Sequence, residues 1–568
     1  MPADKKDEYD YKRFFPFEKI RPEQDVAIKF ILDAFLKQKK RFVIGDIAVG
    51  VGKSAIAITI SRYLAAMDHP HVVPEIGSWM LTTQKVLQDQ YVADFGPQKR
   101  DILRSIKSSS NFGCTYYQDQ SCGESRRLLM QLGKKENAGE FRSHCKTVCP
   151  YVLAKKEFIE SHNSLTNFSY FLSVSKYQEE KEGSGFNPNQ INRRQLLIVD
   201  EAHCVESEIS KFVEVVFSER FAKDVLKCDL PRLTHDQIKN ILVVHAWLQS
   251  KYEPALDRHI KSLVAKIKKK IENGEEDQVL TELSKQNSML DKHICKLHRF
   301  LEIFSSDNWI MNVILPTPGS QNKHKKFEFK PIDVSPHCEG LLFQYGERVL
   351  LLSATIIDKD VFCQSIGIDP KETAYIRLAS PFPVENRPIF SMRIGKMSMK
   401  HIDGTLPKIA LTVDEILKQH SDEKGIIHCT SFKVAKYVHE NVTSKRLLIH
   451  TSEDRDAILQ QHLTSPEPTV LLSPSMMEGV DLADDASRFQ ILCKIPFPYL
   501  GDSVIQRRKE KHVKWYAFQT VKSIVQAMGR SIRNERDHAV SYILDEDWEY
   551  FYKMNKDMFP PEFQQSIC

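Results

Sequence analysis

The sequence has no long apolar run, no secretory leader and little net charge. No stretch approaches the roughly 18 uninterrupted apolar residues that would span a bilayer. The N-terminus, MPADKKDEYDYKRFF, mixes both signs of charge and lacks the apolar core of a secretory signal. We therefore expect a soluble intracellular protein of the cytoplasm or nucleus, without a membrane partner. A net charge of +5 over 568 residues gives no global indication of nucleic-acid binding.

The composition also excludes a disordered chain and a disulfide scaffold. Apolar residues make up 42% of the chain and charged residues 27%, as in soluble globular proteins. Eight of the twelve cysteines are scattered singly, which is typical of small buried side chains in a reducing compartment. The length predicts about three or four folding units.

Two sets of short apolar runs alternate with helical stretches. The first set lies at 42–60, 79–83, 195–203 and 347–355, and the second at 425–432, 446–451, 469–475, 489–497 and 539–546. Runs that are apolar throughout suit parallel strands buried on both faces, so we predict two α/β lobes. Two insertions interrupt the first set: a cysteine-bearing segment at 111–150, and a segment at 220–335 with long helical spacing and few strand signals.

The segment IAVGVGKS at 47–54 is typical of a phosphate-binding loop between a strand and a helix. Glycines at Gly50 and Gly52 let backbone amides approach phosphate oxygens without a Cβ in the way. Lys53 would reach the β and γ phosphates of ATP, and Ser54 would ligate Mg²⁺. The strict motif has glycine at its first position, where this chain has isoleucine. The alternative is a glycine-rich turn beside an ordinary surface lysine.

An acidic pair, Asp200 and Glu201, ends the apolar run LLIV. Carboxylates at the carboxyl end of a parallel strand face the crevice where ligands bind. Asp200 can hold Mg²⁺ through water, and Glu201 can orient and deprotonate the attacking water. A solvated pair at a strand end is the alternative, and it loses weight because the quartet is Asp-Glu-Ala-His and follows a phosphate loop.

The order of these motifs resembles that of superfamily 2 helicases of the DEAH type. That order is IAVGVGKS, VDEAH, LLSAT at 351–355 and QAMGRSIRN at 526–534. Further segments resemble the XPD/DinG branch: RPEQ at 21–24, CPYVLAKKEF at 149–158, SPF at 380–382 and MEGVDLADDASRFQILCKIPFP at 477–498. The matching motifs extend from about residue 21 to about residue 546.

The resemblance assigns roles to further residues. Gln24, with Arg21 nearby, matches the nucleotide-contacting motif near the N-terminus. Gln526, Arg530 and Arg533 match the last motif, whose arginines would face the γ-phosphate and neutralise charge developing there. Ser353 and Thr355 match a motif that couples hydrolysis to lobe movement. Glu478, Gly479 and Asp481 match a motif that senses nucleotide and strand together.

Four cysteines, Cys114, Cys122, Cys145 and Cys149, fall within one short segment before the Asp-Glu-Ala-His box. Four thiolates suit both zinc and iron-sulfur clusters, so the chemistry alone leaves the metal open. XPD-like helicases carry a 4Fe-4S cluster at this place, with a Pro-Tyr pair after the last ligand as after Cys149 here. The close spacing between Cys114 and Cys122 differs from the wider spacing in many XPD-like relatives. His144 is either a substitute ligand or a loop histidine.

Basic and aromatic side chains surround these cysteines, as in sites that bind phosphates and stack on unpaired bases. They are Tyr116, Tyr117, Arg126, Arg127, Lys134, Lys135, Arg142, Lys146, Lys155 and Lys156. The alternative is a solvated basic surface. As a cluster, they predict a nucleic-acid path.

The sequence thus predicts two RecA-like α/β lobes with an iron-sulfur insertion and a helical arch-like insertion in the first. The expected boundaries are 1–110, 151–219 and 336–380 for lobe 1, 111–150 for the cluster domain, 220–335 for the arch-like domain and 381–568 for lobe 2. The resemblance implies a monomeric ATP-dependent helicase that moves 5′ to 3′ on single-stranded or forked DNA. Two alternatives are an ATP-driven translocase that does not separate strands, and a zinc-bearing nucleic-acid binding protein.

Overall fold

A computed structural model gives the fold of most of the chain. It describes residues 9–67, 75–118, 120–125, 136–182, 190–227, 240–273, 278–314, 325–451, 453–474, 482, 484–529, 531–532 and 537–568. Among these, no helix is both long and apolar enough to cross a membrane.

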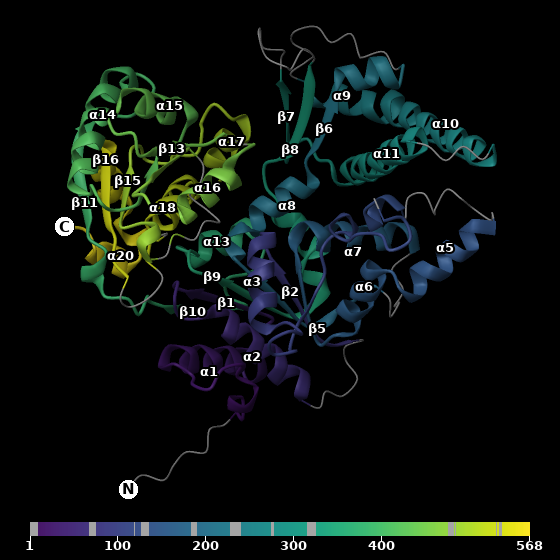
Figure 1. The fold of residues 1–568 in the computed structure, drawn as a ribbon, viewed down its shortest axis with the longest axis horizontal. Coiled ribbons are helices and arrows are strands. Elements are labelled where there is room, and N and C mark those ends of the chain that lie inside the picture. Colours follow the sequence, from purple (N-terminus) through teal and green to yellow (C-terminus); the bar gives the residue numbers. More distant parts are fainter. Residues whose placement is uncertain are drawn as a thin grey trace.

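The first lobe is built on a seven-stranded parallel sheet with the order β10-β1-β9-β5-β2-β4-β3 (Figure 1). Its strands are β1 (Phe42–Ile47), β2 (Glu75–Thr82), β3 (Arg104–Ser105), β4 (Asn163–Asn167), β5 (Arg194–Asp200), β9 (Gly346–Ser353) and β10 (Thr373–Leu378). Successive residues of β1 point to opposite faces, so Val43 and Phe42 enter different core clusters. Both faces are therefore covered, as the uninterrupted apolar runs predict.

Helices cover each face of this sheet. On one side lie α1 (Pro22–Leu36), α2 (Lys53–Ala66) and α3 (Lys85–Phe95), and on the other α7 (Phe168–Glu182), α8 (Val205–Val213), α12 (Ser335–Leu341) and α13 (Lys359–Ile366). The strand order places β1, β9 and β5 side by side, so the segments that follow them meet at one edge.

The second lobe has a six-stranded parallel sheet with the order β11-β16-β15-β12-β14-β13. Its strands are β11 (Ile389–Gly395), β12 (Gly425–His428), β13 (Leu447–Ile449), β14 (Val470–Ser473), β15 (Phe489–Leu492) and β16 (Val540–Asp545). The helices are α14 (Ile402–Gln419), α15 (Phe432–Asn441), α16 (Arg455–Thr464), α17 (Ser503–Lys511), α18 (Trp515–Met528), α19 (Asp547–Asn555) and α20 (Pro561–Gln565). The prediction of two α/β lobes is confirmed.

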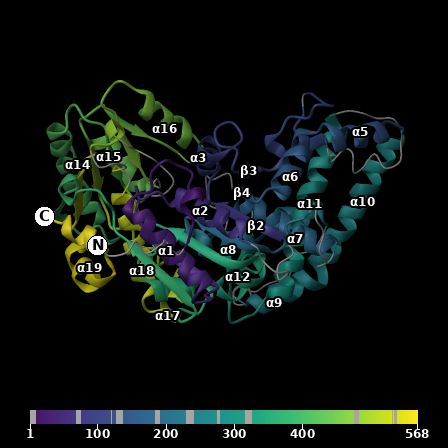
Figure 2. The same ribbon diagram turned by 90° about the horizontal axis from the view of Figure 1, so that it is seen from below.

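The helices of two insertions project from the first lobe, on the side away from the second (Figures 1 and 2). One carries α5 (Glu136–Thr147) and α6 (Pro150–Glu160), and the other α9 (Ile241–Trp247), α10 (Glu253–Glu272) and α11 (Gln278–Ile303). The insertions contact each other through an ion pair between Lys285 Nζ and Glu124 Oε1 at 3.1 Å. Hydrogen bonds from Ser121 and this lysine lower the pKa of Glu124 to about 2.

The second insertion also contains strands that the sequence analysis did not identify. An antiparallel sheet joins β6 (Val215–Ser218), β8 (Lys326–Pro331) and β7 (Trp309–Ile314). Its core is aromatic, with Phe329 packed against both Phe217 and Phe300. Strand β8 alternates half-buried and buried residues over only six positions. So short an alternating pattern is hard to recognise in a sequence segment dominated by two long helices.

A buried arginine ties the polar strand β4 to the rest of the first sheet. Arg194 is 2% exposed. Its Nη1 donates to the carbonyl oxygen of Ser161 at 2.9 Å and to Ser164 Oγ at 2.8 Å, and its Nη2 donates to the carbonyl oxygen of Ile159. The guanidinium also lies 3.6 Å from the ring centroid of Trp79 on β2. One side chain thus joins β2, β4 and the end of α6.

Replacing Arg194 with methionine should destabilise the first lobe by about 3 kcal/mol or more, because several buried acceptors lose a charged donor. The neighbouring Arg193→Met variant is the matched control, since Arg193 is exposed. Thermal melting and hydrogen exchange in β2 and β4 measure the effect. Equal melting temperatures and equal exchange in the two variants would contradict the prediction.

Candidate active site

The phosphate loop joins β1 to α2, which begins at Lys53. Gly50 and Gly52 have φ angles of 89° and 94°, a region that favours glycine. A Cβ at Gly52 would also stand 2.5 Å from Gln24 Nε2. Ile47, where the strict motif has glycine, is the last residue of β1 and is fully buried in the core. The departure from the motif therefore falls in a strand, outside the turn that the two glycines form.

The start of α1 holds the phosphate loop from one side. Arg21 Nη1 donates to the carbonyl oxygen of Gly50 at 2.6 Å, and Gln24 Nε2 donates to that of Val51 at 2.8 Å. Gln24 Oε1 in turn accepts from the backbone N–H of Arg21 at 2.9 Å. The structure therefore places Arg21 and Gln24 against the loop. Lys53 Nζ lies over the same loop, 3.4 Å from the carbonyl oxygen of Ile47.

Phe382, from the SPF segment, covers the loop on its other side. A Cβ at Gly50 would stand 2.0 Å from Phe382 Cζ. Phe382 packs in turn with Ile532 and Ala539 of the second lobe. One ring therefore contacts the phosphate loop and also the segment that follows α18.

The acidic pair lies at the carboxyl end of β5. Asp200 is 9% exposed, and Glu201 adopts a left-handed conformation with φ 53° that turns the chain sharply after the strand. Burial, and then the charge of Glu201, raise the pKa of Asp200 to about 6, while Lys53 acts in the opposite direction. This opposing effect of Lys53 places its charge near the carboxylate of Asp200.

Tyr91 on α3 contacts one of the predicted magnesium ligands. Its hydroxyl donates to Asp200 Oδ2 at 2.9 Å. Burial and the charge of Asp200 hold the pKa of Tyr91 well above its usual range, so the phenol keeps its proton. Tyr91 was not predictable from the sequence, because a single tyrosine on an ordinary helix carries no motif.

A buried hydrogen-bond network links the acidic pair to the second lobe. His203 Nδ1 lies 2.8 Å from Ser353 Oγ and 3.3 Å from Glu201 Oε2, and His203 Nε2 lies 2.7 Å from Gln526 Nε2. Gln526 Nε2 also donates to Thr355 Oγ1 at 3.1 Å. The structure thus brings together residues from three motifs that are far apart in the sequence.

Other predicted residues of this site lie outside the described residues. They are Arg530, Arg533, Glu478, Gly479 and Asp481.

The four cysteines of the first insertion are all buried and belong to one apolar cluster. The sulfur atoms of Cys122 and Cys149 are 3.3 Å apart, and the backbone N–H of Tyr117 donates to Cys114 Sγ. Four buried thiols are the donor set that an iron-sulfur cluster needs, although no three such ligands in the described residues are grouped around a common point. His144 instead contacts Thr115 Oγ1 at 2.8 Å.

The surroundings of these cysteines are partly described. Arg142, Lys146 and Lys156 are exposed, and Lys155 is half-buried. Tyr116 and Tyr117 both pack against Phe141. The remaining basic residues of the predicted path, Arg126, Arg127, Lys134 and Lys135, lie outside the described residues.

Comparisons with known protein families agree with these features. The family described as Helicase C-terminal domain matches residues 414–565, and the family described as Type III restriction enzyme, res subunit matches residues 17–228. A probable ATP-dependent helicase of Methanocaldococcus jannaschii is 23% identical over 94% of this chain and 93% of its own. The ATP-dependent DNA helicase YoaA of Escherichia coli is 21% identical over 39% of this chain and 37% of its own.

Solved structures show the same fold. A structure named XPD helicase covers 95% of this chain and 99% of its own with a TM-score of 0.61, at 15% identity. A structure of S. tokodaii Xpd4 covers 96% and 99% with a TM-score of 0.56, at 12% identity. The ordered motifs, the two parallel sheets and these likenesses agree. The chain is therefore similar to superfamily 2 helicases of the XPD/DinG type, and these likenesses support an ATP-dependent helicase.

Proposed function

We propose that the protein couples Mg-ATP hydrolysis to movement along single-stranded DNA and to duplex unwinding, in the 5′ to 3′ direction. The observation that carries the proposal is the network of His203, Ser353, Thr355 and Gln526, because it connects the acidic pair to a helix of the other lobe. A change in the cleft between the lobes would break or form these hydrogen bonds. Hydrolysis and lobe movement would therefore depend on each other.

Each residue of the site has a proposed task. Lys53 would hold the β and γ phosphates of ATP, whose oxygens also meet the loop amides near Gly50 and Gly52. Ser54 and Asp200 would hold Mg²⁺, which neutralises phosphate charge when bound. Glu201 would take a proton from the attacking water. From the second lobe, Gln526, Arg530 and Arg533 would face the γ-phosphate, and Asp481 would help to sense the nucleotide.

The base of ATP has a candidate position beside Arg21 and Gln24. A cavity of about 490 Å³ lies there, lined by Lys12, Phe17, Glu18, Ile20, Pro22 and Asp25. Phe17 offers an apolar ring that suits a flat heterocycle, whereas the carboxylate of Asp25 already accepts from Tyr11 and pairs with Lys29. This placement supports a role of the N-terminal motif in nucleotide contact.

The four cysteines would hold a 4Fe-4S cluster. Such a cluster would hold the insertion at 111–150 rigid beside the arch-like domain at 220–335. The ion pair between Glu124 and Lys285 already joins these two segments. The basic and aromatic residues around it would guide single-stranded and forked DNA. We further propose that the protein acts as a monomer.

A strand-displacement assay with 5′-tailed, 3′-tailed and blunt DNA and RNA duplexes tests the function directly. Unwinding of 5′-tailed DNA alone supports the proposal. ATP hydrolysis stimulated by single strands without displacement would favour a translocase that leaves duplexes intact.

Lys53→Ala and Glu201→Gln should each lower the rate of ATP hydrolysis by roughly 10²-fold or more. Lys53→Ala removes the charge that holds the phosphates, whereas Glu201→Gln removes the base and leaves most binding groups in place. A fluorescent-nucleotide titration should show far tighter ATP binding by Glu201→Gln than by Lys53→Ala. Turnover like that of the wild type in either variant would show that this cleft is not the ATPase site.

Tyr91→Phe should raise the Mg²⁺ concentration needed for half-maximal hydrolysis by roughly 10-fold, because Asp200 loses the hydroxyl that orients it. The KM for ATP at saturating Mg²⁺ should stay unchanged. Tyr63→Phe on α2 serves as the control, since Tyr63 packs against aromatic rings. Equal Mg²⁺ dependence in both variants would remove Tyr91 from the site.

Protein purified without air should be brown and contain iron rather than zinc. Cys149→Ser removes a soft ligand, so the first insertion should loosen, and unwinding should be lost while DNA-stimulated ATP hydrolysis survives in part. Cys338→Ser, at a buried cysteine outside the insertion, is the control. A colourless protein with stoichiometric zinc, and unchanged unwinding in Cys149→Ser, would refute the cluster.

A further inference from the structure

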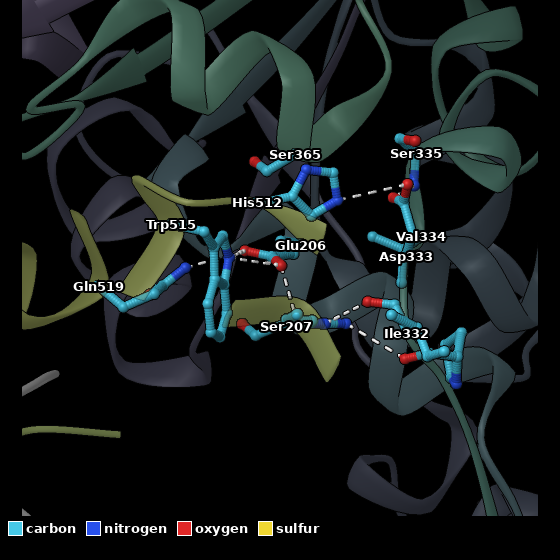
Figure 3. Close-up of polar contacts among 12 residues, drawn as sticks. Glu206, Ser207, Ile332, Asp333, Val334, Ser335, Ser365, His512, Trp515 and Gln519 are labelled. Atoms are coloured by element: carbon cyan, nitrogen blue, oxygen red, sulfur yellow. Dashed lines mark hydrogen bonds and ion pairs between the residues drawn. The ribbon is translucent and has the colours of Figure 1, made fainter. Parts of the chain in front are cut away.

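A second polar contact joins the two lobes (Figure 3). Glu206 lies in the first turn of α8, three residues after His203. Its Oε1 accepts from Arg508 Nη1 at 2.8 Å and from Trp515 Nε1 at 3.1 Å, and its Oε2 accepts from Gln519 Nε2 at 3.0 Å. One carboxylate of the first lobe thus accepts from three side chains of the second.

Arg508 on α17 directs its other donors into the same interface. Its Nε donates to the carbonyl oxygen of Ile332, and its Nη2 to that of Pro331 at 3.4 Å. The side chains of Arg508 and Glu206 are only 9% and 13% exposed. Charged hydrogen bonds at such depth are stronger than those at the surface, and a lost partner leaves a buried charge unpaired. The contact is therefore a firm attachment point.

The spacing of these residues connects the contact to the active site. Trp515, Gln519 and Gln526 follow one another at intervals of four and seven residues, so they lie on one face of α18. That face contacts Glu206 near its start and His203 near its end. His203 and Glu206 are only three residues apart in the sequence. Two neighbouring positions of the first lobe therefore contact the same face of α18.

We propose that Glu206 is a positioning residue that fixes the register of α18 against the acidic box, so that Gln526 meets His203 and Thr355. The inference rests on the proposed function, because it assigns Gln526 a part in hydrolysis. Without the Glu206 carboxylate, Arg508, Trp515 and Gln519 have no common acceptor. The helix can then shift along the first lobe, and Gln526 leaves its partners.

The test compares Glu206→Gln with Trp515→Phe, which removes one donor and keeps a ring, and with Lys511→Ala. Lys511 lies on the same helix as Arg508 and forms an exposed ion pair with Asp333 at 3.5 Å across the same interface. In DNA-stimulated hydrolysis, Glu206→Gln should lower kcat by about tenfold. Its KM for ATP should stay within about twofold, because Glu206 makes no contact with the phosphate loop. Trp515→Phe should lower kcat less, and Lys511→Ala should match the wild type.

A double-mutant cycle separates positioning from mere stabilisation. If Glu206 acts through Gln526, then Glu206→Gln should have no further effect on kcat in a Gln526→Ala protein. Its effect on the melting temperature should be the same in both backgrounds. A full additional loss of kcat in the Gln526→Ala background would overturn the inference, and so would an unchanged kcat in Glu206→Gln alone. A wild-type protein without DNA-stimulated hydrolysis would overturn the proposed function, and the inference with it.

Discussion

The parallel alignment of the first sheet is the constraint on which the active site depends. In a parallel sheet, all carboxyl ends lie at one edge, and the order β1-β9-β5 makes three motif-bearing strands neighbours there. The phosphate loop follows β1, the acidic pair follows β5, and Ser353 ends β9. Residues that are far apart in the sequence therefore lie close together at this edge of the sheet. From the second lobe, α18 presents Gln526 to this edge.

The fold and half of the site were predictable from the sequence because they rest on local patterns. Uninterrupted apolar runs identified β2, β5 and β9, and the glycine spacing identified the loop before Lys53. Strand β4, NSLTN, was not predictable, since its polar residues are buried only through partners such as Arg194 and Ser61. A buried polar strand carries no hydrophobic period to detect.

The side chains that support the site were equally hidden. Tyr91 and Glu206 lie on helices outside the motifs, and each gains its role from a partner on another element. A motif records which residues touch the nucleotide, whereas the groups that orient those residues vary with packing. In this chain the sequence therefore identifies the residues of the motifs more readily than the side chains, such as Tyr91 and Glu206, that orient them.

The ring of Phe382 above Gly50 makes two distant positions depend on each other. The missing Cβ at position 50 leaves the space that the ring fills, and the ring is held there by Ile532 and Ala539. A larger residue at 50 would be strained by the positive φ angle and would also displace the ring, whereas a smaller residue at 382 would leave a void above the loop. The absence of one side chain thus lets a single aromatic ring close the contact between the phosphate loop and the segment that contains Ile532 and Ala539.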